Sequence, residues 1–376
     1  MMNQNTADTY SKRLRNFERF ILKKYNENLD SLVSKLTQKV LDPYEILTSY
    51  CIDLQTRNIS NLTIKHRIVT AKNFLEYNDV EIIPRKFSLK VKLPRIVQKN
   101  IEALSKEEVI DILNVCSDIR LKTFVMFLAS TGCRAGEAAS IRLVDLDFST
   151  HPSKVFIRGE HTKTKVDRTV FLTDELVQQL KSWIKFKYRK RRICSQNKES
   201  GKYFSEYRTP ERSDDNLIFT SRKYDRAEPQ PKHVYMDLCH HFEKTLDRMG
   251  KGARENGNKG RRQITFHSFR RLVKTTISDL GYQDFSEFMI GHAGSTYWRK
   301  KDADKAELFK KIEPYLTYLN IHQLERQGAD IETKIDELEI INTSLREKDK
   351  TKDEIISSLS DRLIALSERI EVLERR

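Results

Sequence analysis

The chain has 376 residues, which is room for two or three domains, and 38% of them are hydrophobic, enough for a sizeable core. No apolar run approaches the roughly 20 residues of a membrane-spanning helix, and the polar, charged start argues against a secretory signal. A formal net charge of +15 predicts a polyanionic partner, with nucleic acid first. A basic solubilising surface and binding to an anionic membrane are the alternatives.

The five cysteines are scattered and include no CxxC pair. This argues against a zinc ribbon and for reduced thiols in an intracellular, cytoplasmic protein. They are Cys51, Cys116, Cys133, Cys194 and Cys239.

Residues 1–83 predict a small all-helical domain. Apolar residues recur at helical spacing around residues 17–24 and 62–75, and Asp42-Pro43 is a typical helix start. Basic residues suggest that one face of this domain binds DNA, although a merely solvated face would look the same. The expected DNA contacts are Lys12, Arg13, Lys65 and Arg67.

Residues 84–103 predict an extended linker, because they are basic and interrupted by Pro84 and Pro94. Lys86 and Arg95 are the expected phosphate contacts in it.

Residues 104–320 predict a second domain. It begins with a capping-box pattern at Ser105 to Glu108 and an apolar helix over residues 121–129. Two strands, residues 155–158 and 168–172, flank a turn, and an amphipathic helix follows over residues 174–186. Polar, basic loops are expected over residues 187–215 and 250–262. Further DNA contacts are expected in these loops, at Arg191, Arg192, Arg261 and Arg262.

Residues 321–376 predict a coiled-coil tail, because one heptad register holds throughout, with Ile frequent at position a and Leu at d. Asn342 at a position a would fix the register of a parallel dimer. The tail carries 10 Lys/Arg against 14 Asp/Glu, unlike the basic remainder. The alternative is a long helix folded back on its own domain.

Two arginines far apart in the sequence suit a phosphodiester. Arg134 follows the apolar helix in Thr131-Gly-Cys-Arg134, and Arg270 lies one helical turn after His267, so these two share a face. Guanidinium groups are rigid, charged, bidentate donors for phosphate oxygens. A structural arginine that caps a turn is the alternative for Arg134.

The other candidates supply proton transfer and a nucleophile. His267 and His292 are potential acid–base groups or phosphate donors. Lys163 lies in the turn between the two strands, where it would protonate a leaving oxygen, and Lys165 competes for that role. Tyr297 is the candidate nucleophile, because a phenolate can attack phosphorus and hold it covalently. Tyr315 and Tyr318 are alternatives whose apolar neighbours suggest core positions.

In order along the chain, these motifs resemble the signature of tyrosine recombinases, the phage-type integrases. They are Thr131-Gly-Cys-Arg134-x-x-Glu137, Lys163, His267-x-x-Arg270, Gly291-His292 and Tyr297. The resemblance spans about residues 103–318, and the helical domain and linker before it resemble the family's core-binding domain. It implies that Arg134, Lys163, His267, Arg270 and His292 activate a phosphate, that Glu137 supports the first arginine, and that Tyr297 attacks. Only four residues separate His292 from Tyr297, fewer than is usual, which leaves open delivery of the tyrosine in cis or in trans. This short segment looks closest to archaeal members.

The expected fold is mainly α with a small β-sheet: a helical bundle, an α+β catalytic domain and a coiled coil. The expected function is site-specific recombination of double-stranded DNA through a 3′-phosphotyrosyl intermediate, with no metal, cofactor or ATP. Dimers in solution and tetramers on paired DNA would form through the tail. The expected setting is the nucleoid of a prokaryote, or a virus or mobile element. A type IB-like topoisomerase and a noncatalytic DNA-bridging protein are the alternatives.

Overall fold

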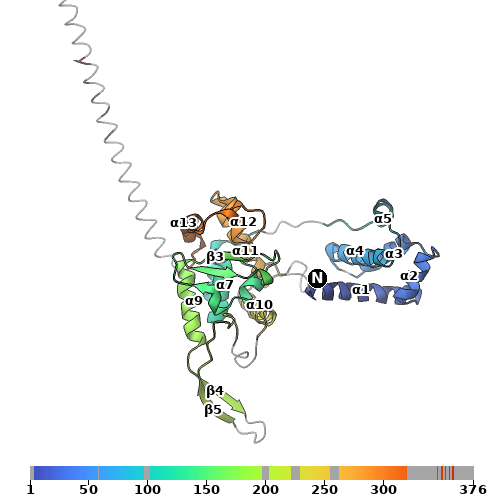
Figure 1. Ribbon diagram of the computed structural model, residues 1–376, viewed down its shortest axis with the longest axis horizontal. Coiled ribbons are helices and arrows are strands. Elements are labelled where there is room, and N and C mark those ends of the chain that lie inside the picture. Colours follow the sequence, from blue (N-terminus) through green and yellow to red (C-terminus); the bar gives the residue numbers. More distant parts are fainter. Residues whose placement is uncertain are drawn as a thin grey trace, which may run out of the picture. The chain divides into compact units, whose positions relative to one another are not determined.

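The structure is a computed structural model that divides the chain into two compact units, residues 1–100 and 101–376. It describes residues 4–57, 59–96, 102–196, 203–221, 229–254 and 262–319, together with six isolated positions of the tail. The predicted fold class, mainly helical with small sheets, is confirmed (Figure 1).

The first unit is helical, and polar caps set where its helices begin. Asn28, Asp42 and Ser60 each accept a hydrogen bond from a backbone N–H in the first turn of a helix, which satisfies donors that would otherwise lack a partner. The helices of this unit are α1 (Gln4–Tyr25), α2 (Leu29–Thr37), α3 (Pro43–Gln55), α4 (Asn61–Tyr77) and α5 (Pro84–Lys90).

Helix α5 corrects the prediction of an extended linker from residue 84. Pro84 stands in the first turn of α5, where its missing N–H costs nothing. The chain after α5 packs on the first unit: Val91 is 3% exposed, and Cys51 Sγ lies 3.6 Å from the carbonyl of Lys92. Residues 84–92 are therefore part of the helical unit rather than a free connection.

The second unit carries the two antiparallel sheets of the structure. Its helices are α6 (Lys106–Val115), α7 (Ile119–Thr131), α8 (Ala135–Ala139), α9 (Asp174–Lys187), α10 (Pro231–Arg248), α11 (Phe266–Asp279), α12 (Gln283–Met289) and α13 (Asp302–Ile312). Its strands are β1 (Leu146–Asp147), β2 (Lys154–Ile157), β3 (Arg168–Phe171), β4 (Arg191–Gln196) and β5 (Tyr203–Arg208). Short 3₁₀ helices are η1 (Leu143–Asp145), η2 (Gly159–His161), η4 (Thr296–Arg299) and η5 (Glu313–Leu316).

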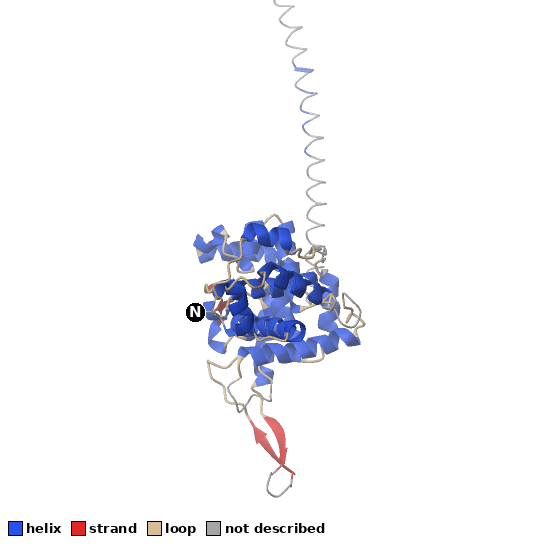
Figure 2. Ribbon diagram, turned by 90° about the vertical axis from the view of Figure 1, so that its right-hand side faces the viewer, coloured by secondary structure: helices blue, strands red, loops and turns tan. Residues whose placement is uncertain are grey.

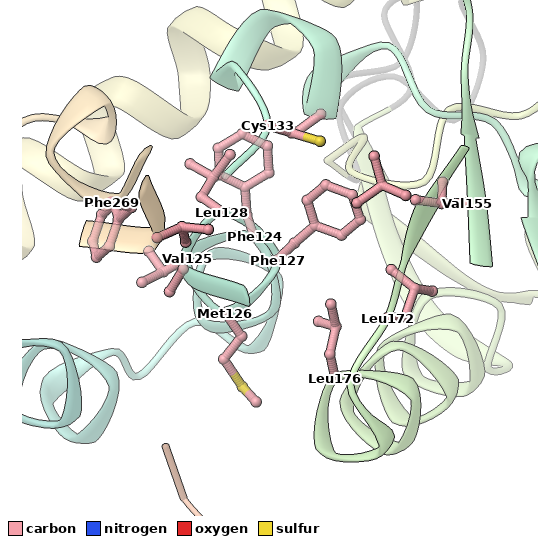
Figure 3. Packing of buried hydrophobic residues seen from close by; sticks show 14 of the residues in the cluster. Phe124, Val125, Met126, Phe127, Leu128, Cys133, Val155, Leu172, Leu176 and Phe269 are labelled. Carbon is pink, nitrogen blue, oxygen red and sulfur yellow. The ribbon is translucent and has the colours of Figure 1, made fainter. Parts of the chain in front are cut away.

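Helix α7 is the centre of this unit's core. Nearly all of its side chains are buried, because it is apolar around its whole circumference. Figure 3 shows Phe127 of α7 on the side of Val155 and Leu172, while Val125 lies on the side of Phe269 in α11. The end of α7 is therefore held firmly between the sheet and α11.

The three-stranded sheet has the order β1-β2-β3, and β2 and β3 form the predicted hairpin, with Ile157 opposite Arg168. A second hairpin, β4-β5, corrects the prediction of a loop over residues 187–215. It extends away from the helices of its unit (Figure 2). Its strand pairing joins residues that show no apolar periodicity, which is the signal that the prediction used.

The end of the second unit is tied down by a buried carboxylate. Glu175 accepts hydrogen bonds from the backbone N–H groups of Tyr318 (2.8 Å) and Leu319 (2.5 Å). The predicted coiled coil over residues 321–376 lies outside the described residues, apart from six isolated positions. No helix of the described part of the chain is long and apolar enough to cross a membrane.

Candidate active site

The turn after α7 places the first arginine. Gly132 ends α7 with φ +65°, and a Cβ there would lie 3.1 Å from side-chain atoms of Val273 and Ile290. Glycine is therefore required both for the left-handed backbone and for the close packing. Arg134 follows at the start of α8, with its side chain 27% exposed.

Glu137 joins two arginines within this turn. Its carboxylate accepts from Arg134 Nη1 (2.8 Å) and from Arg168 Nη2 (2.6 Å), and it also accepts from the backbone N–H of Arg134. The side chains of Glu137 and Arg168 are each 1% exposed. Burial alone would raise the pKa of Glu137, but the guanidinium groups of Arg168 and Arg134 hold it below its ordinary value. Glu137 is thus a buried carboxylate that binds both the side chain and the backbone of Arg134.

Arg270 reaches the same turn from α11. Its Nη1 donates to the carbonyl of Gly132 (2.9 Å), and the residue is 4% exposed. Burial, helped by the nearby charge of Arg134, lowers the pKa of Arg270 to about 10. Its buried Nη2 has no hydrogen-bond partner among the described residues. Such a donor favours an anionic oxygen, because a buried guanidinium without one loses its hydration uncompensated.

A cavity of about 540 Å³ lies beside this turn, and Arg134, His267 and Arg270 all line it. Its charged and imidazole-bearing residues are Arg134, Glu243, Arg254, Arg262, His267 and Arg270. This excess of cationic groups can bind a phosphate and stabilise negative charge on its oxygens. The described lining includes none of Lys163, His292 and Tyr297.

His292 lies where α12 ends. Gly291 has φ +74°, and His292 Nδ1 pairs with the Glu287 carboxylate, which also binds Lys274 Nζ at 2.6 Å. This arrangement orients the imidazole and leaves Nε2 as its other polar atom. A Cβ on Gly291 would lie 2.7 Å from Cζ of Arg168. Arg168 therefore connects the Gly-His motif to Glu137 and the turn after α7.

Tyr297 lies in η4 and is half-buried. Ser295 caps η4, accepting from the Tyr297 N–H (3.1 Å) and donating to the Asp284 carbonyl (2.9 Å). The tyrosine ring makes an edge contact with Phe285 of α12 at 5.0 Å between centroids, and Lys300 Nζ lies 3.8 Å from the ring centroid. Tyr297 is thus anchored on α12 of its own chain, close to His292.

The other tyrosine candidates differ from each other. Tyr318 is 1% exposed, and its hydroxyl donates to the carbonyl of Ala129 (2.9 Å), so it is a core residue as predicted. Tyr315 is 51% exposed, so its prediction as a core residue is wrong. It follows Pro314 in the single turn of η5, which presents it outward.

Lys163 and Lys165 both lie in the loop between β2 and β3, and both are exposed. Lys165 has φ +57° and its Nζ donates to the carbonyl of Glu160 (2.8 Å). Arg168, at the base of this loop, fixes β3 beside Glu137. The loop therefore starts at the candidate site although neither lysine lines the cavity.

Comparison with known proteins identifies the family. Residues 102–296, more than half of the chain, match the profile of the Phage integrase family. The chain belongs to the phage integrase family. Tyrosine recombinase XerA of Saccharolobus solfataricus is 28% identical over 135 residues, which are 36% of this chain and 43% of XerA. Transposase A of transposon Tn554 from Staphylococcus aureus is 29% identical over 99 residues, 25% of this chain and 27% of the transposase.

The chain thus spans less than half the length of these two relatives. Among solved structures, XerH site-specific recombinase bound to difH substrate has a TM-score of 0.50 at 16% identity, covering 85% of this chain and 78% of XerH. The predicted resemblance to tyrosine recombinases is confirmed, and the XerH likeness supports the fold.

The expected DNA contacts lie in different surroundings. In the first unit, Lys12, Lys65, Lys86 and Arg95 are exposed, and Arg13 and Arg67 are half-buried. On the second hairpin, Arg192 is exposed and Arg191 is half-buried, whereas Arg261 lies outside the described residues. Arg262 lines the cavity, and both of its terminal nitrogens bind the Asp247 carboxylate, at 2.6 and 2.9 Å. Its charge is therefore already paired.

Sequence reasoning missed Arg168 as a member of the candidate site. Arg168 is the first residue of the predicted strand over residues 168–172. The apolar residues Val170 and Phe171 indicated a strand, and no role was predicted for Arg168. A charged residue at an inward-facing strand position was the available signal, because such a residue is buried only with a partner. Glu287 and Asp284 were missed as well, since a single acidic residue on a short helix is no distinctive pattern.

Proposed function

We propose that this protein is a site-specific DNA recombinase that cleaves and rejoins double-stranded DNA through a 3′-phosphotyrosyl intermediate on Tyr297. The observation that carries the proposal is the cavity in which Arg134, His267 and Arg270 meet, together with the buried Nη2 of Arg270, which has no hydrogen-bond partner among the described residues. Membership of the phage integrase family and the similarity to recombinase XerA support the same reaction.

In the cleavage step, the phenolic oxygen of Tyr297 forms a bond to the scissile phosphorus as the bond to the 5′ oxygen breaks. His267 accepts the phenolic proton, and Lys163 gives a proton to the departing 5′ oxygen. Arg134 and Arg270 stabilise the charge on the nonbridging oxygens, and His292 positions the phosphate. A 5′ hydroxyl from a partner duplex reverses each of these transfers, so the bond energy is retained without ATP.

Lys163 is the better of the two lysines for the general acid. Lys165 already donates to the Glu160 carbonyl, whereas the side chain of Lys163 makes no hydrogen bond to a described residue. Lys163 is therefore free to follow the DNA when the loop meets it.

DNA binding is proposed for both units, through the exposed basic residues of the first unit and the β4-β5 hairpin of the second. The solved structure of XerH is a complex with its difH substrate. Assembly is proposed through the heptad pattern of residues 321–376, as dimers that pair on two duplexes. Removal of residues 321–376 should lower the number of chains per particle measured by light scattering, and an unchanged number of chains would contradict this assembly. The cytoplasm of a prokaryote, at the nucleoid, is the proposed location.

The test is a covalent-adduct assay. The protein is incubated with supercoiled plasmid or a host-derived DNA library, stopped with detergent and digested, and the nucleotide-bearing peptide is mapped by mass spectrometry. An adduct on Tyr297 that is absent from Tyr297→Phe and persists in EDTA supports the proposal. An adduct on Tyr315 moves the nucleophile. No adduct on either DNA, with binding retained, favours a noncatalytic DNA-bridging protein.

A type IB-like topoisomerase shares this chemistry and would give the same adduct. Strand exchange between two labelled duplexes distinguishes the two reactions. Relaxation of supercoils without exchange would favour the topoisomerase.

A further inference from the structure

Arg168 is a buried cation in the core of the site that the proposed mechanism does not use. Its side chain is 1% exposed, and its Nη2 binds the Glu137 carboxylate at 2.6 Å. The Sγ of Cys133, the residue before Arg134, lies 3.6 Å from the same nitrogen. A buried charge needs compensation, and Glu137 supplies it. This pair lies next to the turn that carries Arg134, so it can affect the reaction through that turn.

We infer that Arg168 is a positioning residue, which holds Arg134 in its phosphate-binding place by fixing Glu137, and which sets the Gly291-His292 segment against the same turn. The inference rests on the proposed strand-cleavage reaction. Arg168 touches no reacting atom and acts through Glu137.

The geometry of Glu137 explains how Arg168 acts on Arg134. Its two carboxylate oxygens are divided: Oε1 binds Arg134 Nη1, and Oε2 binds Arg168 Nη2 and the backbone N–H of Arg134. Without Arg168, the carboxylate would keep only Arg134 as a cationic partner, and Oε2, then held only by the backbone N–H of Arg134, could shift toward that guanidinium. Arg134 would then be neutralised more completely by Glu137, and less of its charge would face a phosphate. Arg168 therefore keeps Arg134 both placed and electrostatically available.

Arg168 also lies directly against Gly291, the residue before His292. Built on this glycine, a Cβ would lie 2.7 Å from both Cζ and Nη1 of Arg168 and 2.9 Å from Nε. The backbone before His292 is thus pressed directly on the guanidinium plane. Among the described residues, Nε and Nη1 of Arg168 have no hydrogen-bond partner, so this face of the guanidinium is held by packing. One side chain of β3 thereby connects the turn after α7 with the end of α12.

Arginine suits position 168 better than lysine would. A lysine at position 168 would keep the charge, but its single ammonium group could not reach Glu137 and also provide a flat surface for Gly291. Arg168→Lys should therefore preserve the buried ion pair in part and still disturb both neighbours. This separates a positioning role from simple charge compensation.

The experiment measures single-turnover cleavage of a duplex that contains the site found in the adduct assay, together with its Kd and the thermal unfolding midpoint. Arg168→Lys should bind DNA within about twofold of the wild type while the cleavage rate at saturating protein falls by about 10- to 100-fold, the range for a misplaced catalytic group. A cleavage rate within twofold of the wild type would overturn the inference, as would a loss confined to DNA binding.

Arg120→Lys is the matched control. Arg120 is also buried and also paired with a carboxylate, Asp237, at 2.8 Å, but it lies at the other end of α7, about 18 Å away at 1.5 Å per residue. It should lose similar thermal stability and keep its cleavage rate. If Arg120→Lys slows cleavage as much as Arg168→Lys does, the effect of Arg168 is general destabilisation and the inference is wrong.

A double-mutant cycle gives a readout that a purely structural role would not produce. If Arg168 acts in part through Arg134, adding Arg168→Lys should slow cleavage by a smaller factor in Arg134→Ala than in the wild type, whereas independent effects would multiply. Gly291→Ala, which places a methyl group against the same guanidinium, is a second variant should Arg168→Lys fold poorly, and it should show the same pattern. Multiplying effects in both cycles would overturn the inference.

The single variant Arg134→Ala distinguishes a failure of the proposed function from a failure of the role inferred for Arg168. If Arg134→Ala cleaves normally, the proposed function itself fails. If Arg134→Ala is inactive while Arg168→Lys cleaves normally, only the role of Arg168 fails.

Discussion

The guanidinium group of Arg270 is buried, although a charged group is more stable in water. Burial lowers its pKa to about 10, and its Nη2 has no partner among the described residues, although Nη1 binds the Gly132 carbonyl. Such a residue contributes little to folding, since the cost of dehydrating the charge offsets its hydrogen bond and packing. The arrangement is understandable if an anionic phosphate completes the hydrogen bonds of Arg270.

We therefore predict that stability and cleavage separate at Arg270. Arg270→Met should change the free energy of unfolding by less than about 1 kcal/mol, because the lost hydrogen bond and the removed desolvation cost oppose each other. Cleavage should fall by about 10² to 10³, as for the loss of one preorganised donor to a transition-state oxygen. Urea unfolding and single-turnover cleavage measure the two quantities. A loss of several kcal/mol would show instead that Arg270 is a structural residue.

Glu137 gives a prediction about pH. Its pKa is lowered in the folded protein from an ordinary value of 4.5, so its carboxylate stabilises the fold fully above about pH 4.5 and progressively less as the pH falls through the lowered value. Glu137→Gln cannot lose a proton, so the difference in unfolding free energy between wild type and variant should shrink below pH 4.5. Urea unfolding from pH 3 to 7 tests this. A difference that stays constant across the range would mean that folding does not lower the pKa of Glu137.

At the residue scale, the sequence identified the residues whose chemistry is distinctive but not the contacts that organise them. Arg134, His267 and Arg270 were predicted and share one cavity, because an arginine after a glycine turn and a His-x-x-Arg pair are readable locally. Arg168 was not predicted, because its importance comes from Glu137 and Gly291, which are 31 and 123 positions away in the sequence. Such long-range contacts leave no local pattern.

At the scale of elements, prediction succeeded where capping and apolar periodicity coincide. Ser105 and Glu108 form the expected capping box at α6, and α7 ends at Gly132 as expected. It failed for α5 and for the β4-β5 hairpin, whose sequences are basic and polar. In such segments apolar periodicity is weak, and propensity alone decides the local structure poorly.

The β4-β5 hairpin should be a DNA-binding element that the fold does not need. An isolated two-stranded ribbon adds little to a core, and Arg191, Arg192 and Arg208 give it a positive charge. Replacing residues 191–208 with a short Gly-Ser linker should leave the thermal midpoint nearly unchanged while DNA affinity falls. The slope of log Kd against log salt should decrease by about 0.9 for each phosphate contact that is lost.

Substituting Arg191 and Arg192 together with Gln is the matching variant, because it removes charge and keeps the strands. It should reproduce most of the decrease in slope. If the full replacement lowers the thermal midpoint by many degrees, the hairpin is part of the folded core; if neither variant changes the slope, it does not meet phosphate.

At the scale of the whole molecule, the chain divides into two compact units. The first unit has its own core, around the contact of Phe17 and Phe20 with Tyr50, and the second has its own around α7. Each core is built from residues of one unit alone. The candidate catalytic residues all belong to the second unit, so we expect the first unit to bind and place DNA.

When several copies of the chain assemble, Tyr297 could attack a phosphate bound by its own chain or one bound by a neighbouring chain. Within one chain, η4 is capped through Ser295 on Asp284, and Trp298 Nε1 donates to the His292 carbonyl at 2.8 Å. The end of α12 in turn presses on Arg168, beside the turn that carries Arg134. An unbroken series of contacts thus leads from Tyr297 to the cavity of its own chain. These contacts favour attack in cis.

A mixing experiment tests this. Tyr297→Phe lacks the nucleophile but keeps the cavity, and Arg134→Ala keeps the nucleophile but lacks the cavity. With attack in cis, every protomer in a mixture of the two is defective in one required part, so the mixture should cleave no faster than either variant alone. With attack in trans, the tyrosine of the Arg134→Ala chain would serve the intact cavity of its neighbour and cleavage would return. Recovery of even a quarter of wild-type cleavage in an equimolar mixture would show that η4 leaves α12 and crosses between subunits, and that the contacts of Ser295 and Trp298 describe the protein before assembly.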